Sequence, residues 1–268
     1  MNNIFEYASR CLHDSLVEEK LAATRDAWMA YEQGRLTFEP EEPPQPIEKT
    51  RFPQHPVLVA PKRLPKRSLS TSEGLIAFLH SIAHIEFTAI YLAWDILYRF
   101  RGLPPPFYAD WLGVAHEEAL HFSMIRGRLR ELGSDYGMLP AHRGLWEVAE
   151  DTAHDLLARL ALVPRYMEAR GLDVTPSMID KLDRAGDKQS AALLTRILDD
   201  EVGHVGTGSR WFGYVCEHRG LEPERAYFDL LKRHLRGRVR GPFNHALRES
   251  AGFTRSELLK LENMGSEQ

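Results

Sequence analysis

The amino-acid sequence predicts an all-α protein built on a four-helix bundle. Four long segments carry apolar residues at helical spacing, and each of them has a glutamate within its apolar stripe. The pattern Glu-x-x-His occurs twice, at Glu118–His121 and at Glu201–His204. With 268 residues, 43% of them hydrophobic, the chain can bury a substantial core around these segments.

The N-terminal part, residues 1–69, is expected to form one helix or a helix pair, followed by a proline-rich strap. Residues 3–34 carry apolar positions at helical spacing, and Gly34 ends the pattern. The proline-rich stretch 40–65 cannot be regular helix, because proline lacks the N–H that helices need. Its isolated apolar residues favour a segment packed on the bundle, and a disordered linker explains the composition equally well.

The bundle is expected to occupy residues 70–220, with its first two helices at about 70–100 and 107–132. Ser70 or Ser72 can cap the first helix, and Gly102 with three following prolines stops it. Around Glu86, apolar residues lie 4, 7 and 11 positions away on both sides: Leu75, Leu79, Ile82, Ile90, Ala93 and Leu97. A carboxylate buried there costs several kcal/mol unless it is paired, protonated or bound to a cation.

The remaining bundle helices repeat this pattern. Glu118 lies in the stripe of the second helix, and His121 shares its face because residues i and i+3 are neighbours on a helix. A third helix is expected at about 145–170, kinked at Pro164 and carrying Glu168, and Thr175-Pro176 is expected to open another short helix. The fourth helix should run from about 187 to 219. The C-terminal extension, 221–268, is expected to contain two or three short helices.

The glutamates and histidines form a repeated set. Glu118 lies 32 residues after Glu86, and Glu201 lies 33 residues after Glu168, so two helical hairpins each supply a lone glutamate and then Glu-x-x-His. Carboxylate-bridged di-metal centres in four-helix bundles use this ligand set. The predicted metal ligands are Glu86, Glu118, His121, Glu168, Glu201 and His204. Oxygen donors with one imidazole per metal favour two iron or manganese ions over zinc.

Two further acids and several competing candidates bear on this set. We predict that Asp200 orients His121 and that Glu117 orients His204, because imidazole ligands usually donate their second N–H to a carboxylate or carbonyl. Taken singly, a glutamate in an apolar stripe is more often a bundle-edge residue than a ligand. Ligand-like spacing also occurs at His80 with His84, and at Glu147 and Glu150 with His154. His84 lies about 200° around the helix from Glu86 and so faces away from it, which favours another role for His84. Glu168 is preferred over Glu147 and Glu150, because only Glu168 preserves the repeat of the two hairpins.

Composition excludes some classes of protein. The formal charge of −4 is not the strongly positive charge typical of a nucleic-acid binder. A basic run such as residues 232–240 is more often part of a solvated helix than a phosphate-binding site. Cys11 and Cys216 show neither a disulfide framework nor thiolate zinc spacing. Because no signal peptide and no uninterrupted apolar run of membrane length are found, a cytoplasmic protein without a membrane partner is expected.

Five blocks of the sequence also resemble a widespread bacterial family of ferritin-like proteins of unknown function: residues 80–95, 110–122, 157–176, 199–212 and 241–253. The resemblance covers nearly the whole chain. More distantly, the family is similar to the di-iron hydroxylase that oxidises an isopentenyl-type adenosine in tRNA. The resemblance implies a ferritin-like fold and the same six ligands, but no substrate, because function does not follow from fold alone.

The leading interpretation is an oxidoreductase with two iron or manganese ions and dioxygen as co-substrate, acting on an unknown substrate. No flavin or nicotinamide fingerprint is present, so electrons would come from an external donor. Tyr91, Tyr166 and Trp94 are candidate redox or pocket residues, although core packing is the commoner role. Two rival functions are iron storage or detoxification, and a tRNA-modifying hydroxylase that holds tRNA through residues 232–240. A monomer or small homo-oligomer is expected.

Overall fold

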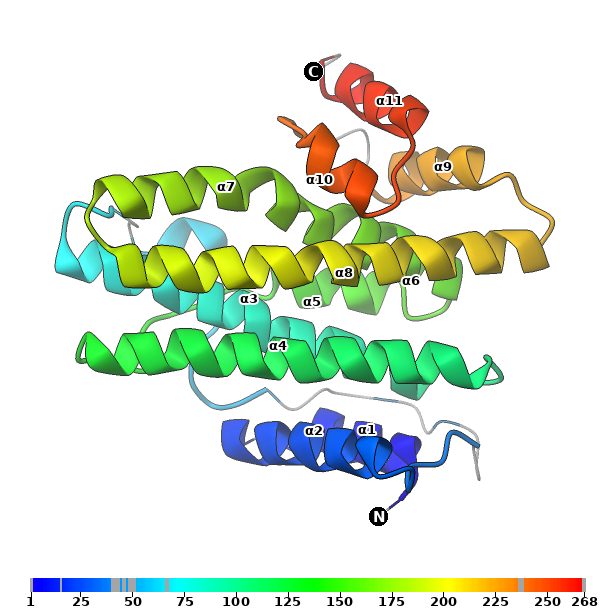
Figure 1. Ribbon diagram of the computed structural model, residues 1–268, viewed down its shortest axis with the longest axis horizontal. Helices are drawn as coiled ribbons and strands as arrows, with labels where there is room; N and C mark the ends of the chain where they lie inside the picture. The colour runs from blue at the N-terminus through cyan, green and yellow to red at the C-terminus, as the bar shows by residue number, and fades with distance from the viewer. Residues whose placement is uncertain are drawn as a thin grey trace. The chain divides into compact units, whose positions relative to one another are not determined.

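A computed structural model confirms the all-α class (Figure 1). It describes residues 2–14, 16–39, 44, 47, 52–65, 68–235 and 239–266. Within these ranges the only β-structure is two isolated bridges, Asn3 with Thr37 and Leu58 with Ala141. The helices are α1 (Ile4–His13), α2 (Val17–Glu32), the 3₁₀ turn η1 (Pro61–Arg63), α3 (Ser72–Arg99), α4 (Pro105–Glu131), α5 (Gly144–Asp151), α6 (Leu156–Leu162), the π-helical turn η2 (Val163–Glu168), α7 (Ala169–Arg184), α8 (Lys188–His218), α9 (Pro223–Leu235), α10 (His245–Ser250) and α11 (Arg255–Ser266).

The chain divides into two compact units, Met1–Trp146 and Glu147–Gln268, which are described separately. The boundary between them falls inside the segment 70–220 that was expected to form the bundle. The division into an N-terminal part, a bundle and a C-terminal extension therefore stays a prediction. Parts of the proline-rich strap, and Arg236 and Arg238 of the basic run, lie outside the described residues.

The first unit is organised around the antiparallel hairpin of α3 and α4, which pack against each other along their lengths (Figure 1). The N-terminal helix pair covers this hairpin, with α1 against α3 and α2 against α4. In the described part of the strap, Phe52 stacks on Tyr91 with ring centroids 4.5 Å apart, and Val59 N–H donates to the carbonyl of Ala141. The strap thus contributes to the core of this unit.

The ends of α3 and α4 follow from local chemistry. Thr71 caps α3, because its hydroxyl accepts a hydrogen bond from the N–H of Gly74 at 3.1 Å, so the expected cap at Ser70 or Ser72 is wrong. Pro105 begins α4, where its missing N–H costs nothing. Gly133 follows α4 with a φ of 76°, a left-handed conformation that glycine adopts without strain.

Helix α3 is long and apolar enough to cross a membrane by length and composition alone. However, 78% of its most apolar window is buried inside the protein, a pattern that core helices of soluble proteins share. His80, His84 and Glu86 interrupt its apolar sequence, so α3 does not contradict the expectation of no uninterrupted apolar run of membrane length.

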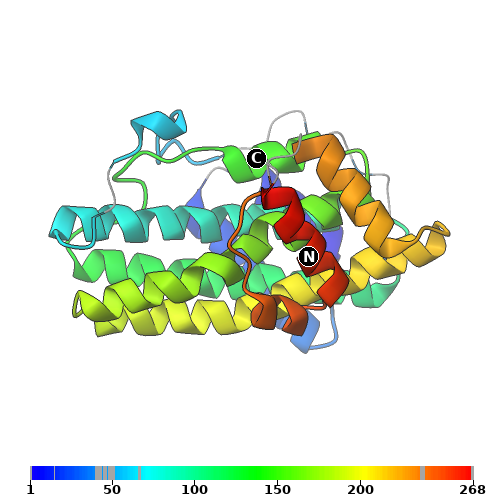
Figure 2. The ribbon, with the colours of Figure 1, turned by 90° about the horizontal axis from the view of Figure 1, so that it is seen from above.

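The second unit is built on α8, against which α6, η2 and α7 pack. Helix α9 contacts α6 and α8, α10 contacts α7 and α8, and α11 follows α10 (Figure 2). The C-terminal helices therefore belong to the same compact unit as α8.

Two expectations for this unit are corrected. Residues 145–170 do not form one helix, because α5 ends at Asp151 and α6 begins after Asp155, which caps it through its side chain. Pro164 lies at the start of the π-helical turn η2, which interrupts the regular helix there. Pro176 opens no new helix and lies inside α7, where packing against α8 outweighs the lost hydrogen bond.

Candidate metal centre

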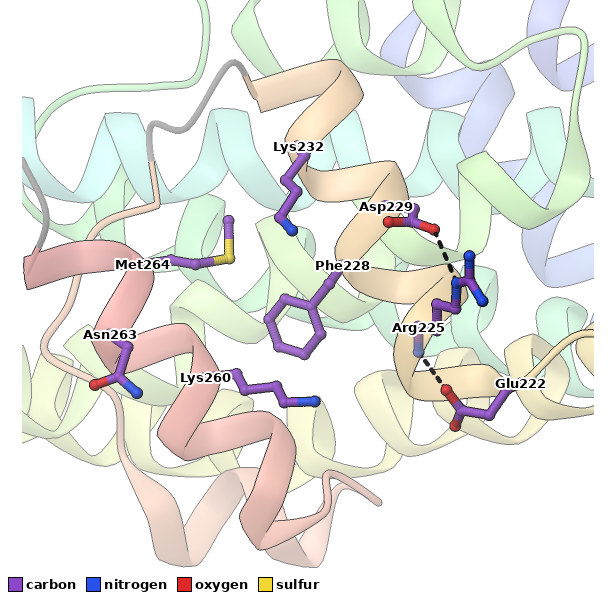
Figure 3. Close-up of a pocket in the computed structure, with 8 residues that line it drawn as sticks. All are labelled: Glu222, Arg225, Phe228, Asp229, Lys232, Lys260, Asn263 and Met264. Atoms are coloured by element: carbon purple, nitrogen blue, oxygen red, sulfur yellow. Dashed lines mark hydrogen bonds and ion pairs between the residues drawn. The ribbon is translucent and has the colours of Figure 1, made fainter.

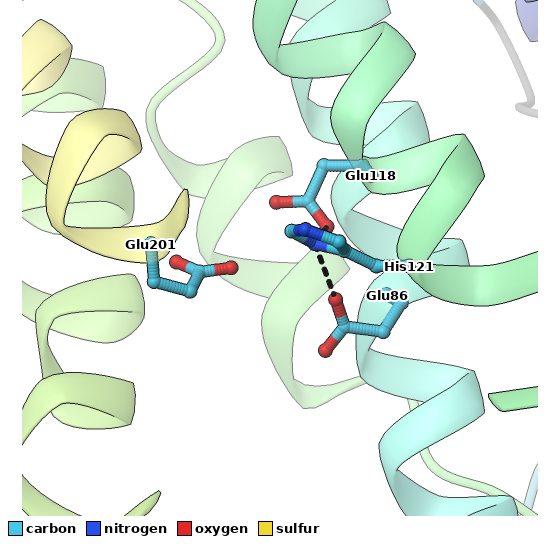
Figure 4. A group of neighbouring side chains, drawn as sticks. All are labelled: Glu86, Glu118, His121 and Glu201. Atoms are coloured by element: carbon cyan, nitrogen blue, oxygen red, sulfur yellow. Dashed lines mark ion pairs between the residues drawn. The ribbon is translucent and has the colours of Figure 1, made fainter. Parts of the chain in front are cut away.

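In the first unit, Glu86 of α3 and Glu118 and His121 of α4 come together (Figure 4). Nδ1 of His121 lies 3.2 Å from Oε2 of Glu86 and 3.7 Å from Oε2 of Glu118. The three side chains are nearly inaccessible, at 4%, 1% and 1% exposure. One donor atom of each lies within 4.8 Å of the others, which is close enough for all three to hold one ion. We name these residues the α3–α4 cluster.

The electrostatics of the α3–α4 cluster favour a cation. Burial alone would lower the pKa of His121, but hydrogen bonds and charge from Glu118 and Glu86 outweigh it and raise that pKa to about 11. The imidazole is therefore protonated at neutral pH, and one positive charge faces two carboxylates. A divalent cation would take the place of this proton and neutralise both acids, so the residues present fit a metal ion.

In the second unit, Glu201 and His204 share one face of α8. Nδ1 of His204 lies 3.6 Å from Oε1 of Glu201, and His204 is buried whereas Glu201 is partly exposed. Glu168 ends the π-helical turn η2 and is partly exposed, although its Oε2 atom is inaccessible to solvent. Figure 4 also draws Glu201, which belongs to this unit. Among the described residues, neither Glu168 nor His204 belongs to a cluster of three or more potential ligands.

The two acids expected to orient the histidines are both partly buried. Asp200 accepts a hydrogen bond from Nε of Arg196 at 2.8 Å, one helical turn earlier on α8. Glu117 precedes Glu118 on α4. Their pairing with His121 and His204 stays a prediction.

His80 and His84 hold the loop that follows α4. Nε2 of His80 accepts hydrogen bonds from the N–H groups of Gly137 and Leu139, and Nε2 of His84 donates to the carbonyl of His142 at 3.0 Å. Burial lowers the pKa of both histidines to about 4, so both rings are neutral. Since a carbonyl can only accept, Nδ1 of His84 accepts the hydroxyl proton of Tyr136, at 2.9 Å.

The remaining candidate residues have simpler roles. Glu147, Glu150 and His154 are exposed, which does not suit a buried ligand set. Tyr91 lies between core aromatics, and Trp94 donates its indole N–H to the hydroxyl of Thr24 at 2.9 Å. Both therefore contribute to packing.

Sequence reasoning missed two buried ion pairs in the second unit. Arg165 of η2 pairs with Glu257 of α11 at 2.8 Å, and Arg248 of α10 pairs with Asp173 of α7 at 2.8 Å. The partners are 92 and 75 residues apart in the chain, so no local pattern relates them. Both pairs connect the C-terminal helices to the helix that carries Glu168.

A pocket of about 430 Å³ lies between α9 and α11, outside the candidate ligands (Figure 3). Phe228 and Met264 supply its apolar part, and the rest of its lining is polar or charged. Most of the charges are compensated, since Lys260 pairs with Glu224 and Arg225 lies 3.8 Å from Asp229.

Comparisons with known proteins agree with one another. The sequence profile of a family described as "Protein of unknown function (DUF455)" matches residues 13–259. An uncharacterized protein of Haemophilus influenzae is 46% identical over 214 residues, which cover 77% of this chain and 74% of that protein. No solved structure shows a significant match.

Proposed function

The chain belongs to the DUF455 family of proteins of unknown function, and from its buried carboxylate and imidazole donors we propose that it is a di-metal oxidoreductase that uses dioxygen. The proposal depends chiefly on the α3–α4 cluster, in which two carboxylates and an imidazole converge in a nearly water-free interior. A buried cluster with this excess of acid is costly to a protein unless a cation compensates it.

In the proposal, Glu201 joins Glu86, Glu118 and His121 in one centre, and Glu168 and His204 complete the six ligands. This arrangement corresponds to a ferritin-like bundle, with one Glu-x-x-His pair from each helical hairpin. Carboxylate oxygens with one imidazole per ion suit iron or manganese. Asp200 and Glu117 orient the two imidazoles by accepting their second N–H groups.

The residues around the α3–α4 cluster prepare it for redox chemistry. Iron or manganese bound there would supply electron transfer and activation of dioxygen, which no side chain can supply. Phe87 and Phe122 directly follow the ligands Glu86 and His121, are fully buried, and pack with ring centroids 5.1 Å apart. Both rings add apolar packing between α3 and α4 next to the ligands in the chain, and the carboxylates would balance the charge of bound ions.

The proposal leaves the organic substrate open and requires an external electron donor. It is tested by isolating the protein from its native host, measuring its metals, and following oxygen uptake after anaerobic reduction. We expect about two iron or manganese ions per chain and oxygen consumption that depends on them. Glu118→Gln should abolish both, whereas Glu131→Gln, at the exposed end of α4, should abolish neither. A protein with no bound transition metal would refute the proposal, and uptake that ends in stored ferric iron would favour iron handling.

A further inference from the structure

The helix that carries the proposed ligand Glu168 is interrupted by the π-helical turn η2, which ends at that residue. An α-helix advances about 100° per residue, and a π-turn accommodates one extra residue, so later residues are rotated by about 100° from regular positions. Pro164 favours this turn, because it has no N–H to donate to the carbonyl one turn earlier. The direction in which Glu168 leaves the helix therefore depends on η2 being kept.

Helix α9 holds the main chain of η2. The hydroxyl of Tyr227 donates a hydrogen bond to the carbonyl of Arg165, at 3.1 Å, and Tyr227 is fully buried. A side-chain hydroxyl thus binds a carbonyl within the turn itself. Because a buried polar group is costly to leave unsatisfied, this bond favours the observed path of the turn over a regular helix.

Helix α11 holds the side chain of Arg165. Its guanidinium pairs with Glu257 at 2.8 Å, and both side chains are 4% exposed. The guanidinium carbon also lies 4.8, 4.4 and 4.6 Å from the ring centroids of Phe212, Tyr227 and Phe253. A buried arginine with an acid partner and three aromatic faces has few other positions of comparable energy. The aromatic cage therefore fixes the middle of η2.

Helix α8 supports the turn from another side. A Cβ atom added to Gly208 would lie 2.4 Å from Cβ of Pro164, which no pair of real side chains tolerates. At Gly213, further along α8, an added Cβ meets nothing within 4 Å. Glycine at position 208 is thus required for the close approach of α8 to η2.

We infer that Tyr227, Arg165 and Gly208 are positioning residues for Glu168, and that the C-terminal helices α9 and α11 are therefore part of the metal centre. This inference rests on the proposed function, since it gives Glu168 a role only as a ligand. In this inference, the C-terminal helices stabilise the π-turn η2 and thereby orient the carboxylate of Glu168. Loss of the Tyr227 hydroxyl should then affect the ion that Glu168 binds more than the overall fold.

The test compares single-atom changes at the turn with matched changes elsewhere. Tyr227→Phe removes the hydroxyl that binds the Arg165 carbonyl, and Gly208→Ala places a methyl group against Pro164. Their controls are Tyr214→Phe and Gly213→Ala, both on α8. Metal-free protein is titrated with Co²⁺, with binding followed by calorimetry, coordination by the visible spectrum, and fold by thermal unfolding.

We expect the wild type and both controls to bind two ions. Tyr227→Phe and Gly208→Ala should lower the affinity for one of the two ions about 10-fold or more and change its visible spectrum. Residues that orient metal ligands have effects of this size. Unchanged affinities and spectra in both variants would overturn the inference alone. An equal loss of affinity for both ions, together with a lowered melting temperature, would also overturn the inference, because that result indicates a general loss of folded structure. A wild type that binds no ion would refute the proposed function itself.

Discussion

Replacing Glu118 with glutamine should make the metal-free protein more stable while removing its stabilisation by metal. In the α3–α4 cluster, two carboxylates face one protonated imidazole, with Nδ1 of His121 at 3.2 and 3.7 Å from their oxygens. With both carboxyl groups ionised, these three side chains carry a net negative charge at 1% to 4% exposure. Glu118→Gln leaves the closer Glu86–His121 pair intact and removes this excess. Because each buried ion costs several kcal/mol in effective desolvation, we expect a gain of about 1–3 kcal/mol.

The same substitution removes one ligand. A metal ion present at about 100 times its dissociation constant stabilises the folded wild type by about 2.7 kcal/mol, and the variant should gain little of this. The assay is urea unfolding of both proteins with and without Mn²⁺, with the exposed Glu131→Gln as the control expected within about 0.5 kcal/mol of wild type. If metal-free Glu118→Gln were less stable than wild type by about 1 kcal/mol or more, the claim of excess buried acid would be wrong.

Three further predictions concern other parts of the chain. Burial lowers the pKa of Lys20 to about 8 in the folded protein, so between about pH 8 and 10.5 the unfolded chain binds more protons than the folded one. The free energy of unfolding of the wild type, relative to Lys20→Met, should therefore rise with pH across this window by up to about 3 kcal/mol. Denaturant unfolding of both proteins at several pH values measures this difference. A difference in the free energy of unfolding that does not change with pH would contradict the lowered pKa of Lys20. Arg248→Ala removes two charged hydrogen bonds to the buried Asp173 and leaves Arg170 as the ion-pair partner of that acid, so it should cost about 1.5–3 kcal/mol. Arg225→Ala, in the exposed pair with Asp229, should cost less than about 1 kcal/mol. Similar losses for the two variants in thermal unfolding would argue against the difference in burial. Asp200→Ala should lower metal occupancy without lowering the melting temperature, and unchanged occupancy would remove its orienting role.

The sequence predicted well what depends on local periodicity. Glu86, Glu118 and His121 were identified because each interrupts an apolar stripe, and the structure buries them together. The same reasoning placed Glu168 on a helix kinked at Pro164, and a periodicity argument has no means of detecting the π-turn found there. Every residue of α6 is buried, so its apolar residues do not mark one face of the helix. The pattern therefore could not show that the helical periodicity is shifted after Leu162.

What the sequence could not predict depends on long-range contacts. Pro176 looks like the start of a helix, yet the packing of α7 on α8 holds it inside one. His80 and His84 have the spacing of ligands, and only the loop after α4 shows that they anchor main-chain groups there. Arg165 lies within a turn that looked merely kinked, and its acid partner comes from the last helix of the chain.

The central claim is that buried acids in this protein are compensated by divalent metal. Anaerobic calorimetric titration of the metal-free wild-type chain with Fe²⁺ tests it most directly. We predict saturable binding of two ions per chain, with protons released as the metal displaces the one held by His121. Absence of saturable binding, with the chain still folded, would contradict the account.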